Sequence, residues 1–310
     1  MSYDNTLRLV AKGIYMLKGI ILAGGSGTRM FPLTKGVSKQ LLPIYDKPMV
    51  YYPLSILMLA GIKDILVITT PKDNAGFVSL LGDGSQWGIH IEYVIQEKPN
   101  GIAEAFLIGA EFIGSNPVAL ILGDNIFYGD KLPEKLQNVA RRNTGATIFT
   151  YKVNNPWDYG VVYKDKDGAI TDIIEKPINT KPLSDWAVTG LYFYDNSVVA
   201  RATNLRPSYR NELEITDLNK AYLASGELKV EELGRGSAWL DTGTPDSLLD
   251  AGLFVRTMQQ RQGLQVACLE EIALNKGYIT IEALTKTACA LAHSDYKVYL
   301  LKLVEEQSTN

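Results

Sequence analysis

The chain has 310 residues, and its hydrophobic (46%) and charged (21%) fractions are those of an ordinary globular protein, which excludes disordered, collagen-like and coiled-coil classes. Its 31 Lys and Arg against 34 Asp and Glu give a formal net charge of -3 without a basic block, which argues against a nucleic-acid partner. Apolar runs are far shorter than the roughly 20 residues of a membrane helix, and residues 1–15 lack the apolar core of a secretory signal. We therefore expect a cytoplasmic protein without a membrane partner.

The first half of the chain alternates short apolar runs with helical segments, which is the pattern of βαβ units around a mostly parallel sheet. We expect strands at 18–22, 64–70, 89–96 and 117–122, and helices at 48–60, 74–81 and 102–113. Ligands of open α/β sheets bind at the carboxyl ends of strands. The loops after Leu22 and Leu122 are therefore the first candidates for a site.

The second half is richer in β-structure, and its tail from Cys268 onward is helical in pattern. We expect strands at 146–153, 160–164, 169–175, 186–194 and 237–242, and a helix at 214–224. The fold class is thus α/β, with a Rossmann-like, mostly parallel central sheet, helices on both faces and a helical C-terminal appendage. We expect residues 1–15 to be an extension and 16–310 a single domain whose helical end spans about 252–310.

A glycine-dense turn, Gly24, Gly25, Ser26, Gly27 and Thr28, follows the first predicted strand. Backbone without Cβ atoms can approach an anion closely, so this turn is a candidate phosphate cradle, although it matches neither a P-loop nor a dinucleotide fingerprint. Arg29 and Lys39 could neutralise a bound triphosphate. The alternative interpretation is a tight turn with both cations in solvent.

Two aspartates, Asp124 and Asp241, each stand at the end of a predicted strand. Their hard carboxylate oxygens suit Mg²⁺ shared with substrate phosphates. Each residue alone would more often be a turn or helix cap, and their joint placement favours the metal site. Cys268 and Cys289 lack Cys-x-x-Cys spacing, which disfavours zinc and a disulfide framework.

Five segments resemble, in order and spacing, the sugar-nucleotide pyrophosphorylases, which are nucleotidyltransferases, and their thymidylyl branch in particular. They are Leu22–Arg29, Ser38–Pro43, Leu122–Asn125, Glu175–Pro177 and Trp239–Thr244. The resemblance implies transfer of a thymidylyl group from dTTP to glucose 1-phosphate, giving dTDP-glucose and pyrophosphate, as a first step toward sugars such as dTDP-rhamnose. It also implies a homotetramer and a β-rich sugar-binding portion.

The resemblance places residues in roles. The nucleotide would be held by Gly24, Gly25, Ser26, Gly27, Thr28, Arg29, Lys39, Gln40, Gln96, Gly101 and Asp124, and the sugar phosphate by Tyr159, Gly160, Glu175, Lys176, Val188 and Tyr192. Asp124 and Asp241 would ligate Mg²⁺, the expected cofactor. Arg29, Lys39, Asp124, Lys176 and Asp241 would carry the reaction, in which a sugar-phosphate oxygen attacks the α-phosphorus in line. No general base is needed, because that oxygen is already an anion.

Several positions depart from the family pattern, among them Glu104, which stands where a Gln is usual. A second nucleotide site is expected at Gly234 and Arg235, although Asn275 replaces its partner arginine. Three alternatives stay open: a uridylyl-type enzyme, a catalytically silent regulatory subunit of the same fold, and a glycosyltransferase. The last shares a metal aspartate but not the glycine loop with its arginine.

Overall fold

The computed structural model describes residues 16–25, 27–142, 144–177 and 184–308. Its centre is a nine-stranded sheet in which β10, β9, β11, β6, β1, β4 and β5 follow one another, while β8 and β12 extend from β11. The strands are β1 (Lys18–Leu22), β4 (Asp64–Thr69), β5 (His90–Ile95), β6 (Val118–Leu122), β8 (Ala146–Lys152), β9 (Gly160–Lys164), β10 (Ile170–Glu175), β11 (Trp186–Tyr194) and β12 (Leu228–Leu233). The expected α/β fold is confirmed.

Four neighbouring strands, β6, β1, β4 and β5, run parallel, so their carboxyl ends share one edge of the sheet. The loops after Leu22 and Leu122, and the residue Gln96, therefore begin side by side at that edge. The β-rich second half joins antiparallel to it, because β11 pairs with β6. β11 also pairs with β8 and, through Ala187, with β9, so the sheet forks there. Residues from both parts line the cleft described below.

Helices cover both faces of the sheet because successive strand residues point to opposite sides. Ile21 belongs to a core with Leu57 of α2 (Tyr51–Leu59) and Phe77 of α3 (Asn74–Leu81). Ile20 belongs to the other core with Phe106. The first face also carries α6 (Leu132–Ala140), and the second carries α4 (Glu104–Ile108), α5 (Ala110–Ile113), α7 (Val198–Thr203) and α8 (Ile215–Ala224).

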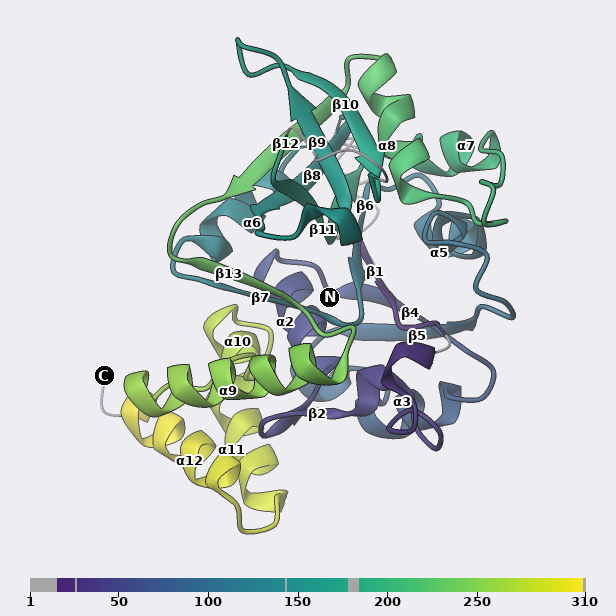
Figure 1. Ribbon diagram of the computed structural model, residues 1–310. Helices are drawn as coiled ribbons and strands as arrows, with labels where there is room; N and C mark the ends of the chain where they lie inside the picture. Colours follow the sequence, from purple (N-terminus) through teal and green to yellow (C-terminus); the bar gives the residue numbers. More distant parts are fainter. Residues whose placement is uncertain (1–15, 26, 143, 178–183, 309–310) are drawn as a thin grey trace.

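A separate two-stranded ribbon is formed by β7 (Asn125–Gly129) and β13 (Ser237–Asp241), and it runs between the β-rich part of the sheet and the C-terminal helices (Figure 1). It leads into the C-terminal helices α9 (Pro245–Gln262), α10 (Leu269–Asn275), α11 (Ile281–Ala290) and α12 (Asp295–Ser308), seen at the lower left of Figure 1. A short pair, β2 (Pro43–Ile44) with β3 (Lys47–Pro48), packs beside α9. Short 3-10 turns stand at Thr28–Met30, Lys39–Leu41, Ser85–Trp87 and Pro156–Asp158.

Three expectations need correction. The helix expected at 102–113 is two helices, which are separated at Gly109. Gly109 packs closely on the sheet, since an added Cβ would lie 3.2 Å from Ile20 and 3.2 Å from Leu66. The helix expected from Pro48 begins at Tyr51, because Pro48 pairs with Pro43. The sequence interpretation also missed six strands and α-helices, which are β2, β3, β7, α6, α7 and β12. Residues 1–15 lie outside the described chain.

Candidate active site

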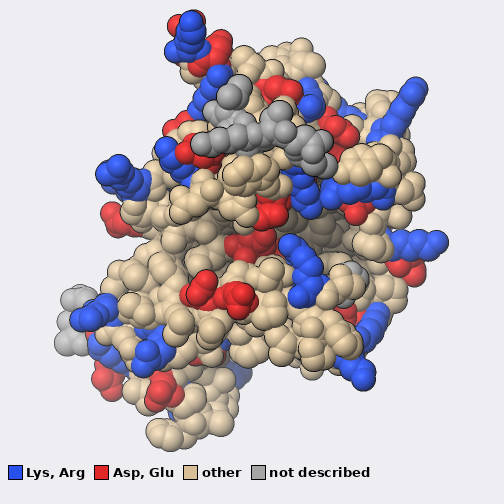
Figure 2. Space-filling model, viewed as in Figure 1, with Lys and Arg blue, Asp and Glu red and all other residues tan. Residues whose placement is uncertain are grey.

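A long cleft runs along the carboxyl edge of the parallel strands (Figure 2). It has two lobes with volumes of about 380 and 400 Å³, and both are lined by Arg29, Leu122, Asp124, Glu175 and Lys176. Because these residues line both lobes, the two lobes form one continuous cavity. Ligands in the two lobes would therefore share these lining residues.

The first lobe brings together the residues expected to hold a nucleotide. It is lined by Gly24, Gly25, Gly27, Thr28, Arg29, Lys39, Gln40, Gln96, Gly101 and Asp124. Ser26, the remaining member of that set, lies outside the described residues. The second lobe gathers every residue expected to hold the sugar phosphate: Tyr159, Gly160, Glu175, Lys176, Val188 and Tyr192, together with Asp241.

The glycine loop follows β1, and its backbone adopts a conformation that residues with side chains rarely adopt. Gly25 and Gly27 have φ values of 110° and 59°, in the region that favours glycine. Thr34 closes the loop by donating its hydroxyl to the carbonyl of Gly27 at 2.8 Å. Arg29 follows, and its guanidinium packs against Gly243, where an added Cβ would lie 2.9 Å from it. Apart from its chain neighbours, no atom of the described residues lies within 4 Å of the Cβ that Gly25 would carry, so the backbone at Gly25 is open to an approaching anion.

Asp124 and Asp241 are brought together by the β7 and β13 ribbon, in which Asp241 pairs with Asn125. The backbone N–H and hydroxyl of Thr242 both donate to the carbonyl of Asp124, at 3.2 and 2.8 Å. The side chain of Asn125 accepts from Gly190 N–H and Trp239 Nε1, so its Nδ2 turns to Asp124 Oδ1 at 3.0 Å. Lys39 Nζ donates to the other oxygen, Oδ2.

The two aspartates repel each other in the protein alone. Burial, followed by the charge of Asp124, raises the pKa of Asp241 to about 6. Two hard carboxylates in one cavity fit a divalent cation, which would relieve this repulsion and take its remaining ligands from phosphate oxygens and water. Within the described ranges, no group of three or more His, Cys, Asp or Glu side chains could hold a metal ion. A cation held by this pair would therefore need further ligands from outside the described carboxylate, imidazole and thiol groups.

The second lobe is built around the end of β10. Glu175 Oε2 accepts from the Thr216 hydroxyl at 2.6 Å, and the backbone N–H of Lys176 donates to Tyr159 O at 3.0 Å. Lys176 has a φ of 43°, a conformation that L side chains rarely adopt, and strained backbone of this kind clusters at functional sites. Thus Glu175 supplies a fixed acceptor and Lys176 a cation at the junction of the lobes.

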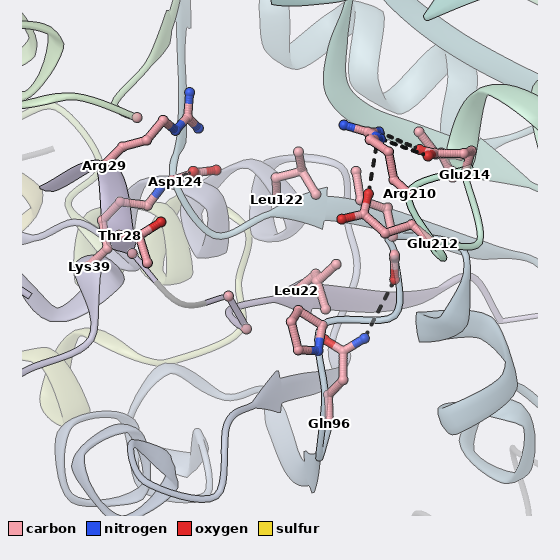
Figure 3. Close-up of a pocket in the computed structure, with 18 of the residues that line it drawn as sticks. Leu22, Thr28, Arg29, Lys39, Gln96, Leu122, Asp124, Arg210, Glu212 and Glu214 are labelled. Atoms are coloured by element: carbon pink, nitrogen blue, oxygen red, sulfur yellow. Dashed lines mark hydrogen bonds and ion pairs between the residues drawn. The ribbon is translucent and has the colours of Figure 1, made fainter. Parts of the chain in front are cut away.

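The sequence interpretation missed one cluster in the wall of the first lobe. Arg210 donates to both carboxylate oxygens of Glu214, at 3.1 and 2.8 Å, and its terminal nitrogen lies 3.3 Å from Glu212 (Figure 3). Glu175 is 4.0 Å away. The only signal in the sequence was the charged run 210–214, which alone would more often indicate a solvated surface.

Gly234 and Arg235 follow β12 and line neither lobe. They precede Ser237, which pairs with Gly129, and Gly129 lines a third cavity of about 270 Å³ together with Asn275. The second nucleotide site at Gly234 and Arg235 stays a prediction.

Comparisons with known proteins place most of the chain in one family. Residues 18–258 match the family model described as nucleotidyl transferase. The glucose-1-phosphate thymidylyltransferase of Xanthomonas campestris is 58% identical, over 93% of this chain and 97% of its own, and that of Mycobacterium tuberculosis is 55% identical over 93% and 99%.

Two solved structures are also similar. A Bacillus anthracis structure described as a glucose-1-phosphate thymidylyltransferase in complex with a sucrose has a TM-score of 0.72 at 39% identity, covering 77% of this chain and 95% of its own. A UDP-glucose pyrophosphorylase shares the fold, with a TM-score of 0.70 at 23% identity over 78% and 99%. The chain therefore belongs to the nucleotidyl transferase family, within its group of glucose-1-phosphate thymidylyltransferases.

Proposed function

We propose that the protein transfers a thymidylyl group from dTTP to glucose 1-phosphate, forming dTDP-glucose and releasing pyrophosphate. The observation that carries the proposal is the continuous two-lobed cleft, with Arg29 and Lys39 at the glycine loop and Lys176 at the junction. A donor nucleotide in the first lobe and a sugar phosphate in the second would meet beside Asp124. Relatives at 55 to 58% identity are named glucose-1-phosphate thymidylyltransferases, and these names support dTTP rather than UTP as the donor.

The chemistry follows from charge. One phosphate oxygen of glucose 1-phosphate attacks the α-phosphorus of dTTP, the bond from that phosphorus to the bridging oxygen of the β-phosphate breaks, and pyrophosphate leaves. Two polyanions must be held in line although they repel each other. Arg29 and Lys39 offset the charge of the triphosphate, and Lys176 offsets that of the sugar phosphate. Glu175, fixed by Thr216, accepts from a sugar hydroxyl.

Magnesium would be held by Asp124 and Asp241. When bound, it supplies a positive charge that lowers the repulsion between the phosphates and stabilises the charge that develops on them. Lys39, which is paired with Asp124 in the free protein, would then be shared with the triphosphate.

The decisive experiment measures pyrophosphate release by the full chain with glucose 1-phosphate and either dTTP or UTP. Faster release with dTTP supports the proposal, whereas a preference for UTP makes the protein a uridylyl-type enzyme. A silent regulatory subunit would release no pyrophosphate from either nucleotide. A glycosyltransferase would instead consume dTDP-glucose, transfer its glucose to an acceptor and release dTDP.

The biological setting is part of the same proposal. We expect a homotetramer that supplies dTDP-glucose for sugars such as dTDP-rhamnose. Leu249 and Leu253 support self-association, because they lie one turn apart on α9 with 63% and 51% of their surfaces exposed. Cys268 and Cys289 are free thiols, which suits a reducing compartment such as the cytoplasm. None of the described helices has the length and hydropathy to span a membrane.

A further inference from the structure

We propose that Glu104 is a positioning residue, which fixes the side-chain amide of Gln96 so that the cleft selects a pyrimidine with a proton on N3. This inference rests on the proposed function, because it concerns the base of the donor nucleotide. Gln96 follows β5 and lines the first lobe, away from Arg29 and Lys39 and beyond Leu22 (Figure 3). The cations mark the triphosphate end of that lobe, so Gln96 lies where the base would be.

The orientation of the Gln96 amide is decided by its neighbours. Its Nε2 donates to Oε2 of Glu104 at 2.7 Å, and the carbonyl of Gly101 lies 3.5 Å from the same nitrogen. The second oxygen of Glu104 accepts from Nδ2 of Asn100 at 2.8 Å. A carboxylate accepts hydrogen bonds and cannot donate them, so the Gln96 atom that faces Glu104 must be nitrogen.

The side-chain oxygen of Gln96, Oε1, consequently points away from Glu104. An added Cβ on Gly24 would lie 2.8 Å from Gln96 Oε1, which places that oxygen beside the glycine loop. No donor among the described residues reaches it, although Gln96 is only 6% exposed. Glu104 itself does not line the cleft. It therefore acts through Gln96, and the cleft presents an acceptor that no described residue satisfies.

An acceptor at this place distinguishes between pyrimidines. Thymine and uracil carry N3–H, which can donate to Oε1, whereas N3 of cytosine is itself an acceptor and would face Oε1 with no proton between them. Buried polar groups that lack a partner are strongly disfavoured. A glutamine at position 104 could either donate or accept, so it would let the Gln96 amide turn over and accommodate either base edge.

The test uses nucleotides that differ only at this edge, namely dTTP and 5-methyl-dCTP. Their dissociation constants are measured by calorimetry without sugar for the wild-type protein, Glu104→Gln and a second variant, Glu104→Ala. Glu97→Gln is the matched control, because Glu97 is exposed next to Gln96 and lines neither lobe. We expect Glu104→Gln and Glu104→Ala to lower the preference for dTTP by about tenfold, and Glu97→Gln to leave it unchanged.

The outcomes separate this inference from the proposed function. Folded Glu104 variants that keep the wild-type preference overturn the role of Glu104, even if the protein releases pyrophosphate from dTTP. An equal loss of affinity for both nucleotides also overturns it, because that result indicates a merely structural residue. A wild-type protein that binds dTTP no better than 5-methyl-dCTP overturns the selection itself. Failure of the proposed function appears differently, as absence of pyrophosphate release by the wild-type protein.

Discussion

Lys39 Nζ donates to Oδ2 of Asp124, so a candidate triphosphate cation and a candidate metal ligand are paired in the protein before any substrate arrives. The two side chains are only 12% and 16% exposed. This pairing lowers the cost of keeping two carboxylates, Asp124 and Asp241, in one cavity. It also means that a bound triphosphate must share Lys39 with Asp124.

We expect Lys39→Met to reduce kcat about 100- to 1,000-fold, because one positive charge at the reacting phosphates is removed from a partly enclosed site. The variant should also unfold at a lower temperature, since Asp124 loses its partner. Pyrophosphate release and calorimetric melting check the two effects. Lys35→Met is the control, because Lys35 is exposed and lines neither lobe. Normal turnover of Lys39→Met would show that Lys39 does not contribute to the reaction.

Asp241→Asn should abolish most turnover and yet stabilise the fold. Burial and Asp124 raise the pKa of Asp241 to about 6, so the charged form of Asp241 is disfavoured in the folded state. A neutral amide removes this repulsion, and we expect Tm without magnesium to rise by about 2 °C. Asp250→Asn, at an exposed position on α9, should change neither quantity. A Tm that does not rise would contradict the repulsion between Asp124 and Asp241.

The parallel core of the fold could be predicted because its signals are local. The apolar run that became β6 and the glycines after β1 each carry their own pattern, and the strand order then places Gly24 and Asp124 at one edge. β7 gave no such signal, since Asn125–Gly129 is stabilised mainly by its pairing with the distant Ser237–Asp241. Propensity within a short window does not report such long-range pairing.

The cleft wall around Arg210 was harder to predict than the strand ends that carry Gly24 and Asp124. Arg210 becomes part of the site because Leu213 N–H donates to Asn100 O at 2.6 Å, while Leu213 O accepts from Ala103 N–H at 3.1 Å. These contacts join segments that are more than a hundred residues apart. In the same way, the link from Glu104 to Gln96 depends on how α4 begins beside the end of β5, which residue spacing alone does not establish.

Gly101→Ala should separate those two segments. Gly101 has a φ of 107°, and an added Cβ would lie 2.4 Å from Leu213 O. Gly168→Ala is the matched control, since Gly168 has a φ of 85° but no atom within 4 Å of its added Cβ. We expect Gly168→Ala to cost about 1 kcal/mol of unfolding free energy, and Gly101→Ala about 2 kcal/mol more from the clash. Equal costs in urea unfolding would show that the segments can move apart freely.

Lys176→Ala should weaken the binding of the sugar phosphate and leave the binding of the nucleotide unchanged. Lys176 lines both lobes at their junction, and its backbone is held by the bond to Tyr159 O. A charge-assisted contact contributes roughly 1.5 to 3 kcal/mol, so we expect the KM for glucose 1-phosphate to rise about 10- to 100-fold. The affinity for dTTP, measured by calorimetry without sugar, should stay within about twofold of the wild-type value, because Arg29 and Lys39 remain.

The control for this prediction is Lys166→Ala, on the exposed turn between β9 and β10. It removes the same charge from the same part of the chain and should leave both measurements unchanged. If Lys176→Ala weakens the binding of dTTP in the absence of sugar, Lys176 binds the triphosphate instead. If it changes neither ligand, the left-handed backbone at Lys176 serves only to turn the chain after β10. The sugar phosphate must then be held by another cation of the cleft, such as Arg210, which lies 4.0 Å from Glu175.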